Sequence, residues 1–405
     1  MTKTPYDYGY SSSNSAAANT AAMNSALNSG FVIDGGGDTY SIDAQLLAGS
    51  NFKGLQNANL QWATLAAAQT AQYQLRIDNC SNWFVDRVSF NLGGERWGGT
   101  VSDSDRGGLR TTSDTTQQNI RITNCTVFGH GAGTGIRVER TAKGVISGNI
   151  VRDREVFANS DGSTNAPNDC QNGIHLDSCE NMTVSDNIVR RLYSRFNGNT
   201  FNKFSRGMTF TSVRHSSVVS NVISDVDQAF DFSGSDDFLG VNGAGGNKAI
   251  SVTGNEVDNC LTWGFKFANS AQDIIVSGNM VRRFGYGGYV CSGYETAKVT
   301  AANAVQRILF VGNYACDPTG AYAGAVCVGF WILSNGDNTN YPQHIRFVSN
   351  SVYDSSGAGQ LQNGYRCDQT TGKGHVWQLN AAFNFKAGGA VYGGTGISAA
   401  DFKTL

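Results

Sequence analysis

Short runs of alternating apolar and polar residues recur along most of the chain at intervals of 24 to 38 residues. One type of run contains two or three apolar or β-branched residues, a small residue, an asparagine and a further β-forming stretch, as in VISGNIV and IVSGNMV. The marker asparagines are Asn124, Asn149, Asn187, Asn221, Asn255, Asn279, Asn313 and Asn350. A period of this length is typical of a protein built from structural repeats.

A second type of run interleaves with the first and consists of a small residue followed by strict alternation, as in GIRVE, GIHLD and GFKFA. It begins at Gly135, Gly173, Gly207, Ala229, Gly264, Gly329 and Gly364. The Asn-Gly turns that close β-hairpins are not placed between the runs, so a hairpin meander is disfavoured. The pattern instead predicts an all-β parallel solenoid of about a dozen coils, each with about three short strands and stacked about 4.8 Å from the next.

The marker asparagines suit a fixed corner of such a coil. Asparagine tolerates a left-handed backbone, and its side-chain amide can bond the same group one coil away. We therefore interpret these residues as a structural ladder and not as catalytic groups. The shortest spacings, 24 and 25 residues, then correspond to a bare coil, and the longer ones include loops that bulge outward at one corner.

The two ends of the chain differ from the repeat. Residues 16–27 have the apolar spacing of a short helix, which would cover the open strand edges of the first coil. The residues after about position 385 are too few for a further domain. We expect one domain, with an N-terminal segment and capping helix (1–30), the solenoid with looped insertions (31–390) and a short tail (391–405).

Composition narrows the function classes. The 405 residues include 50 glycines and only 4 prolines, and 40% are hydrophobic, so the chain can build a core. A net charge of −2 lacks the basic excess of proteins that bind nucleic acid or anionic lipid. No apolar run is long enough to span a membrane, and the N-terminus lacks the apolar core of a secretory signal. We expect no nucleic-acid partner, no membrane insertion and no Sec-type export.

The nine cysteines are scattered, with no C-x-x-C pair and no histidine at zinc spacing. We interpret them as buried thiols that pack like small apolar side chains, and not as disulfides or metal ligands. No phosphate-binding loop or nucleophile elbow is present either. We therefore expect no cofactor.

The first 40 residues combine an aromatic-Asp-aromatic-Gly motif (6–9), a helix and a hydrophobic strand that leads to Gly-x-Thr-Tyr (37–40). With the coil repeat, these features resemble the right-handed parallel β-helix proteins of the pectate-lyase superfamily, and bacteriophage tailspikes in particular. The usual GDGxTDD stretch is replaced by SSSNSAAANT. The resemblance implies a right-handed parallel β-helix and a homotrimer on the virion tail. It also implies a bacterial surface polysaccharide as the bound and often cleaved ligand, and a phage tail adaptor protein as a further partner.

Outward residues of successive coils form columns when the strands stack in register. One predicted column contains Arg137, His175, Thr209, Asp231 and Lys266, and its neighbour contains Glu139, Asp177, Thr211, Ser233 and Ala268. Adjacent coils would place Glu139 beside Asp177, and glycoside hydrolysis requires two carboxylates about 5 to 9.5 Å apart. We predict Glu139, Asp177 and Asp231 as catalytic groups, with Arg137 and His175 binding substrate and holding one carboxylate ionised.

Some of these residues can also be explained without a catalytic role. An outward carboxylate next to Arg137 is often only a solvated cross-strand salt bridge. The acidic stretch SDVDQAFDFSGSDDF places Asp225 and Asp227 on one side of an alternating strand and includes Asp236 and Asp237, so it could bind Ca²⁺ or act as acid and base. It lacks the spacing of a twelve-residue calcium loop, and we predict no metal site.

Three predicted loop insertions combine aromatic residues with Asn, Arg and Asp, and supply Trp97, Phe157, Tyr193 and Arg195 as further substrate-binding residues. Sugar rings stack their C–H faces on aromatic planes, although the same aromatic residues would also suit a subunit interface. The sequence leaves three activities open: a glycoside hydrolase, a lyase or epimerase acting on uronic acids, and a non-catalytic adhesin. His175 with Asp177 resembles the Asp and His of alginate lyase and epimerase β-helices.

Overall fold

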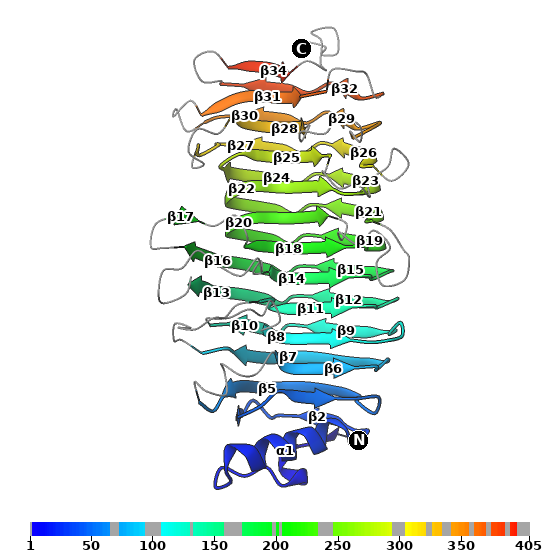
Figure 1. The fold of residues 1–405 in the computed structure, drawn as a ribbon, viewed down its shortest axis with the longest axis vertical. Helices are drawn as coiled ribbons and strands as arrows, with labels where there is room; N and C mark the ends of the chain where they lie inside the picture. The colour runs from blue at the N-terminus through cyan, green and yellow to red at the C-terminus, as the bar shows by residue number, and fades with distance from the viewer. Residues whose placement is uncertain are drawn as a thin grey trace. The chain divides into compact units, whose positions relative to one another are not determined.

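The structure is a computed structural model. It describes residues 2–64, 73–93, 107–129, 133–157, 172–196, 200–201, 205–233, 246–293, 304–320, 326–333, 342–355, 360–369, 374–384 and 389–394. The chain forms two compact units, Met1–Arg206 (unit 1) and Gly207–Leu405 (unit 2). Within each unit, short parallel strands stack coil upon coil (Figure 1). The fold is a right-handed parallel β-helix, as predicted, while the division into segments 1–30, 31–390 and 391–405 stays a prediction.

Three parallel sheets make up unit 1. The first sheet contains β1 (Thr2–Lys3), β2 (Val32–Asp34), β5 (Gly54–Trp62), β7 (Trp83–Asn91), β9 (Ile120–Thr123), β12 (Gly144–Ser147) and β15 (Met182–Ser185). The second contains β3 (Thr39–Ile42), the later halves of β5 and β7, β10 (Thr126–Phe128), β13 (Ile150–Phe157) and β16 (Ile188–Phe196). The third contains β4 (Leu46–Ala48), β6 (Tyr73–Asp78), β8 (Gly107–Thr112), β11 (Ile136–Glu139) and β14 (Asn172–Asp177).

Unit 2 repeats this plan. Its first sheet contains β19 (Arg214–Val219), β21 (Lys248–Thr253), β23 (Gln272–Ser277), β26 (Gln306–Val311), β29 (Arg346–Val348) and β32 (Val376–Gln378). Its second contains β20 (Val222–Ser233), β22 (Glu256–Ala268), β24 (Met280–Phe284), β27 (Tyr314–Cys316), β30 (Ser351–Tyr353) and β33 (Ala381–Phe383). Its third contains β18 (Arg206–Thr211), the later halves of β20 and β22, β25 (Gly287–Ser292), β28 (Cys327–Leu333), β31 (Leu361–Cys367) and β34 (Ala390–Gly394).

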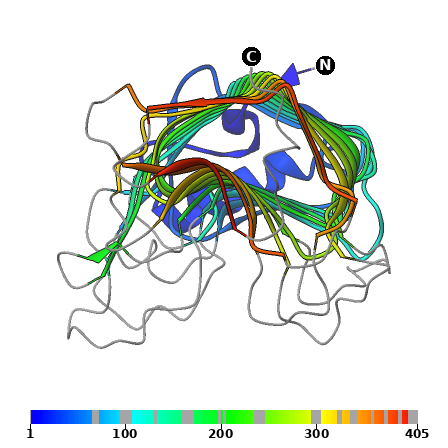
Figure 2. The same cartoon turned by 90° about the horizontal axis from the view of Figure 1, so that it is seen from above.

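Alternation along each strand directs every second side chain into the coil. In the third sheet of unit 2 the inward residues form a stack of fully buried rings, namely Phe230, Phe265, Tyr289, Phe330 and Tyr365. Neighbouring ring centroids in this stack lie 4.5, 5.0, 4.6 and 5.3 Å apart, with the planes nearly parallel. Figure 2 looks along the coils, and within each unit successive strands follow the same outline around this interior.

The predicted asparagine ladder is present and fully buried. In unit 1 the Asn149 side-chain amide donates to Asn187 at 2.9 Å. In unit 2 a ladder of the same kind runs from Asn221 through Asn255, Asn279, Asn313 and Asn350 to Asn380. The side-chain amides of Asn149, Asn255, Asn279, Asn313 and Asn350 also donate to backbone carbonyls, which closes the corner.

Two details of the ladder prediction were wrong. The left-handed backbone belongs to the residue before the ladder position, for example Gly148, Gly278 and Ser349, and not to the ladder asparagine itself. Asn124 is one of these left-handed residues, with φ 55°, and the ladder position in its coil is occupied by Cys125, whose N–H donates to Asn149. Asn124 is therefore a corner residue, and its side chain bonds Asp86 instead.

Helix α1 (Ala16–Leu27) covers the first coil of unit 1, at the predicted bounds, beside the 3-10 helix η1 (Pro5–Tyr8) (Figure 1). Ser15 caps α1 by accepting from the Ala18 N–H at 3.2 Å. Polar side chains of the helix accept from backbone N–H groups of the first coil: Thr20 from Asp43, Asn24 from Leu47 and Asn28 from Gly49, at 3.0, 2.7 and 2.8 Å. The helix thus takes the place of a neighbouring strand along part of this edge.

The cysteines behave as predicted over the described residues. Eight of them are free and buried, and Cys170 lies outside the described residues. Burial raises the pKa of Cys125 and of Cys179 to about 12, so both thiols are protonated and unreactive at neutral pH. None of the described helices has the length and hydrophobicity required to cross a membrane.

His375 fixes the corner before β32 in its neutral form. Its Nδ1 accepts from the Ile345 N–H at 3.2 Å, and its Nε2 bonds Gln369 Oε1 at 3.0 Å. Desolvation by burial, with a smaller contribution from the neighbouring His344, lowers the pKa of His375 to about 4. A protonated ring would lose the bond from Ile345, because Nδ1 would then carry a proton.

We expect unit 2 to lose stability on acidification through His375. The ordinary histidine pKa is about 6.5, so the stabilisation is complete above this pH and declines as the pH falls towards the folded-state value of about 4. The loss should reach about 2 to 3 kcal/mol in urea unfolding at pH 4 relative to pH 7. His375→Asn keeps an acceptor near Nδ1 and should flatten this part of the pH profile. An unchanged slope in the variant would contradict the assignment.

Candidate functional site

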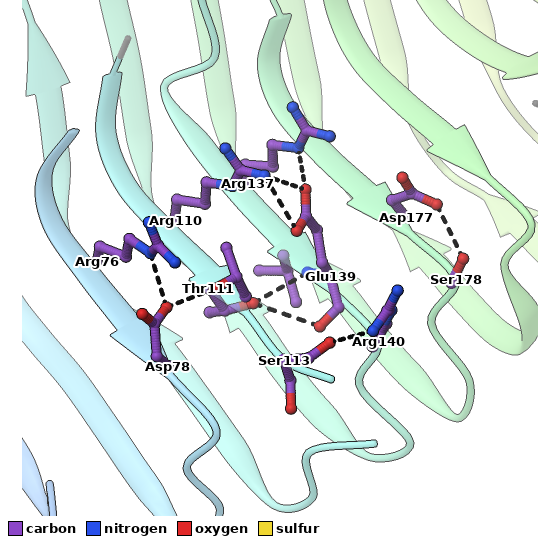
Figure 3. A network of polar contacts seen from close by, with 12 residues as sticks. Arg76, Asp78, Arg110, Thr111, Ser113, Arg137, Glu139, Arg140, Asp177 and Ser178 are labelled. Atoms are coloured by element: carbon purple, nitrogen blue, oxygen red, sulfur yellow. Dashed lines mark hydrogen bonds and ion pairs between the residues drawn. The ribbon is translucent and has the colours of Figure 1, made fainter. Parts of the chain in front are cut away.

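Two columns of polar side chains run along the outer face of the third sheet in unit 1. Register places Arg76, Arg110, Arg137 and His175 at equivalent positions of β6, β8, β11 and β14. The neighbouring outward positions are Asp78, Thr112, Glu139 and Asp177. The residues between the columns, such as Val138 and Leu176, are fully buried, which places the polar set on the opposite side of each strand. Figure 3 shows Arg76, Arg110 and Arg137 of the first column beside Asp78, Glu139 and Asp177 of the second.

Glu139 lies between two arginines. Its Oε1 is 2.5 Å from Arg137 Nε on the same strand and 3.2 Å from Arg110 Nη2 on the preceding coil. Arg110 also reaches Oε2 at 3.4 Å (Figure 3). The Glu139 side chain is only 15% exposed, so these contacts are sheltered from the screening that weakens a surface ion pair. Glu139 is thus a carboxylate in a fixed position with its charge compensated.

Asp177 has a different environment. It is the register partner of Glu139 on the next coil, as predicted, so the two backbones are about 5 Å apart. Its side chain accepts a hydrogen bond from the Ser178 hydroxyl at 3.0 Å (Figure 3). Among the residues that the structure describes, no arginine pairs with Asp177 in the way that Arg110 and Arg137 pair with Glu139. The pair therefore combines one anchored carboxylate with one that is freer to meet a ligand.

Residues 76, 78 and 110 of this network were not predicted from the sequence. Arg76 pairs with Asp78 at 2.8 Å, and Thr112 donates its hydroxyl to the same carboxylate. The signal is a recurring aliphatic-Arg step in QLRID, GLRTT and GIRVE. The pattern of a glycine followed by strict apolar and polar alternation did not detect these strands. Gln74 takes the place of the glycine in β6, and the buried Thr111 takes the place of an apolar residue in β8.

Asp231 belongs to unit 2 and forms a separate group. It pairs in register with Lys266, as predicted, and its Oδ1 lies 4.0 Å from Lys266 Nζ. The Ser233 hydroxyl donates to the same oxygen. Although Asp231 is on the outer side of its strand, its side chain is only 1% exposed. Strand alternation correctly predicted that Asp231 points to the outer side, but it did not predict that the side chain is buried there.

The prediction that Asp225 and Asp227 share one side of a regular strand was wrong. Asp225 has a left-handed backbone, with φ 54°, and accepts from the Asn259 side chain. A register irregularity between Val226 and Gln228 then interrupts the alternation before the fully buried Asp227. Asp236 and Asp237 lie outside the described residues. Among the residues that the structure describes, no group of three or more His, Cys, Asp or Glu is placed to hold a metal ion.

The predicted loop residues also require correction. Phe157 belongs to β13, and Tyr193 and Arg195 belong to β16, so they are strand residues and not loop residues. β13 and β16 are parallel, with Glu155 opposite Tyr193 and Phe157 opposite Arg195, and β17 (Thr200–Phe201) pairs antiparallel with β16. The strands extend because IVRDREVF and IVRRLYSRF contain no glycine or proline to end them. Trp97 lies outside the described residues.

Comparisons with known proteins agree on the fold. The family model of the periplasmic copper-binding protein NosD matches residues 118–304, which is less than half of the chain. The described residues offer no donor cluster for copper. A search of curated protein sequences found no significant match.

Solved structures with the same fold have several activities. The A-module of mannuronan C-5 epimerase AlgE6 from Azotobacter vinelandii has a TM-score of 0.60 at 11% identity, covering 98% of this chain and 97% of the module. The family 28 exopolygalacturonase of Yersinia enterocolitica has a TM-score of 0.53 at 9% identity, covering 100% and 79%. The Dettilon tailspike protein has a TM-score of 0.52 at 13% identity, covering 94% and 68%. At these identities the likeness establishes the β-helix fold and nothing finer.

Proposed function

We propose that this chain binds a polysaccharide along the third sheet of unit 1 and hydrolyses it with Asp177 and Glu139. The observation that carries the proposal is the in-register carboxylate pair, in which Glu139 is held by two arginines and Asp177 is not. Glycoside hydrolysis needs two carboxyl groups in different environments on either side of the scissile bond. Outward columns on stacked coils provide an extended surface suited to a polymer.

The two carboxyl groups take distinct roles in this proposal. Asp177 exchanges a proton with the glycosidic oxygen, because it is the carboxyl group that no arginine of the described part of the chain holds. Glu139 remains an anion beside Arg110 and Arg137 and faces the developing positive charge on the sugar, either directly or through an attacking water. Arg137 and His175 contact the substrate next to the cleaved bond. Asp231 with Lys266 is assigned to binding or catalysis in unit 2.

A bacteriophage tailspike is the biological setting that we propose. The aromatic-Asp-aromatic-Gly opening, helix α1 and the β-helix resemble tailspikes, and the likeness to the Dettilon tailspike is compatible with that assignment. The chain would then act as a homotrimer on the virion tail, attached through a tail adaptor protein. Its ligand would be an O-antigen, capsule or exopolysaccharide of the bacterial host.

A uronate lyase or epimerase is the second candidate. It is favoured by His175, which lies in register with Arg137 and two residues before Asp177 on β14. An imidazole and a carboxylate on one strand could remove and return the proton at C5 of a uronic acid, with an arginine beside the sugar carboxylate. The epimerase fold match is consistent with this alternative without selecting it.

Incubation of the protein with purified O-antigen, capsular polysaccharide, alginate and polygalacturonate separates these activities. A hydrolase creates new reducing ends without ultraviolet absorbance, whereas a lyase creates an absorbing unsaturated end. An epimerase changes the proton NMR spectrum of a uronan without shortening it. Retention of a polysaccharide with none of these changes would leave an adhesin, and would overturn the proposed hydrolysis.

A further inference from the structure

We propose that the second sheet of unit 1 binds the anionic groups of an acidic polysaccharide through the guanidinium groups of Arg152, Arg190 and Arg191. The inference rests on the proposed polysaccharide function and assigns a ligand to a sheet that carries none of the predicted catalytic residues. The group bound is a carboxylate or a phosphate, because the planar fork of an arginine matches either one with two parallel hydrogen bonds.

Register stacks two of these arginines on adjacent coils. Arg152 on β13 is the register partner of Arg190 on β16, so their backbones are about 4.8 Å apart (Figure 1). Both side chains point away from the coil interior, since Val151 and Val189 beside them are fully buried. Like charges at directly opposite positions destabilise a sheet. The stability of the coil therefore does not explain the pair, and a bound anion would relieve the repulsion.

The Arg152 guanidinium is held in place from two sides. It lies over the Phe128 ring of the preceding coil, 5.2 Å from the ring centroid, and it pairs with Asp153. Asp153 also pairs with Arg191, which occupies the equivalent position on the next coil. Both of these residues have left-handed backbones, with φ 56° and 54°. Guanidinium groups that are already fixed lose less conformational entropy when they bind an anion.

Positive charge is accessible and in excess in this cluster. Among the side chains that the structure describes, Asp153 pairs with two of the arginines, and Arg190 forms no ion pair. Within the described residues, three guanidinium groups thus share one carboxylate. The side chains of Arg152 and Arg191 are 34% and 44% exposed, and Arg190 is exposed as well. An anion from solution can therefore reach all three guanidinium groups.

An apolar surface borders the arginines and favours a sugar as the carrier of the anion. Ile150 and Ile188 are register partners on the same outer side, two residues before the stacked arginines, and Ile188 is 36% exposed. The C–H face of a sugar ring can pack on these side chains while its acidic group meets the guanidinium groups. The net charge of the whole chain is −2, which disfavours a nucleic acid or an anionic lipid as the carrier.

Binding of immobilised glycans by the full chain tests this site. Alginate and polygalacturonate present carboxylates, phosphate-containing capsular polysaccharides present phosphates, and dextran is neutral. Single-stranded DNA and anionic vesicles are the alternative carriers of negative charge. The wild type should bind an acidic glycan, and Arg190→Gln should raise that Kd about five- to tenfold, roughly the loss of one charge-assisted contact. Raising NaCl from 0.05 to 0.5 M should weaken wild-type binding about tenfold.

Arg190→Lys separates a fork contact from diffuse attraction. The ammonium group keeps the positive charge without the planar pair of donors, so this variant should recover only part of the affinity. Full recovery would show that the guanidinium geometry is not recognised, and would overturn the site.

Arg121→Gln is the matched control. Arg121 is an exposed arginine on the first sheet of unit 1, and its register partners are Phe84 and Val145 instead of a second arginine. This variant should bind like the wild type, and circular dichroism verifies that each variant is folded. Equal binding by Arg190→Gln and the control, equal affinity for dextran, or tighter binding of DNA or vesicles would overturn the site. Arg190-dependent binding of a glycan that is not cleaved would instead overturn the proposed hydrolysis and leave the site standing.

Discussion

Replacing Asp177 with asparagine should reduce polysaccharide cleavage by about 10²- to 10⁴-fold, the range that a general acid or base contributes. Asp177→Asn keeps the shape of the side chain and can still bond the Ser178 hydroxyl, but it cannot exchange a proton. New reducing ends per minute measure the loss. Glycan binding should stay within about threefold of the wild type, because the proton transfer and not the contact is removed.

Glu139→Gln should reduce cleavage to a similar degree for a different reason. The neutral amide would leave Arg110 and Arg137 without the carboxylate they share, in surroundings where an unpaired charge is costly. Its thermal stability should fall as well, which Asp177→Asn should not show. Comparing the melting temperatures of the two variants therefore separates the anchored carboxylate from the freer one.

Asp114→Asn is the control for both variants, because Asp114 is an acidic residue of unit 1 that is 98% exposed and lies outside the columns. Its cleavage rate should equal that of the wild type. If Asp177→Asn cleaves as fast as this control, Asp177 has no catalytic role. The ion pairs of the columns would then be structural, as the solvated salt-bridge interpretation holds.

Asn279→Ala should destabilise unit 2 by about 3 to 5 kcal/mol, the largest loss expected from a single substitution outside the proposed site. The Asn279 amide donates to Asn313 and to the Val252 carbonyl, and its carbonyl oxygen accepts from the Asn255 backbone and side chain, all at 2.9 Å. All four groups are buried, so truncation leaves several donors and acceptors without partners in the coil interior. Urea unfolding measures the change.

Asn124→Gly provides the comparison. Asn124 occupies the same left-handed corner position as Gly278, the residue before Asn279, and its side-chain bond to Asp86 is exposed. Glycine adopts the left-handed backbone without strain, so the change should cost less than about 1 kcal/mol. Similar losses in the two variants would show that the ladder bonds do not stabilise the coil.

The repeat, the ladder and the capping helix could be predicted because each depends on short-range periodicity. The coil period and the strand alternation predicted which residues point outward. They also predicted two register pairs correctly, Glu139 with Asp177 and Asp231 with Lys266. The ladder was displaced by one residue at Asn124 because RITNCTV contains an asparagine next to the true position. Nothing local distinguishes a corner asparagine from a ladder asparagine.

Other features depend on contacts that alternation does not encode. The sequence indicated that Asp231 points away from the interior, but burial depends on the rest of the fold. Arg110 reaches Glu139 from a strand that begins 29 residues earlier in the chain than β11, where Thr111 disguises the alternation.

Helix α1 also limits how unit 1 can associate. An open strand edge is a template on which another chain can add a strand, the first step towards a fibre. At this edge, backbone N–H groups that could bond an incoming strand donate instead to the side chains of Thr20, Asn24 and Asn28. A helix is finite and offers no strand edge in turn, so strand-by-strand polymerisation stops at the covered groups. The covered N–H groups thereby protect unit 1 from edge-to-edge association at this coil.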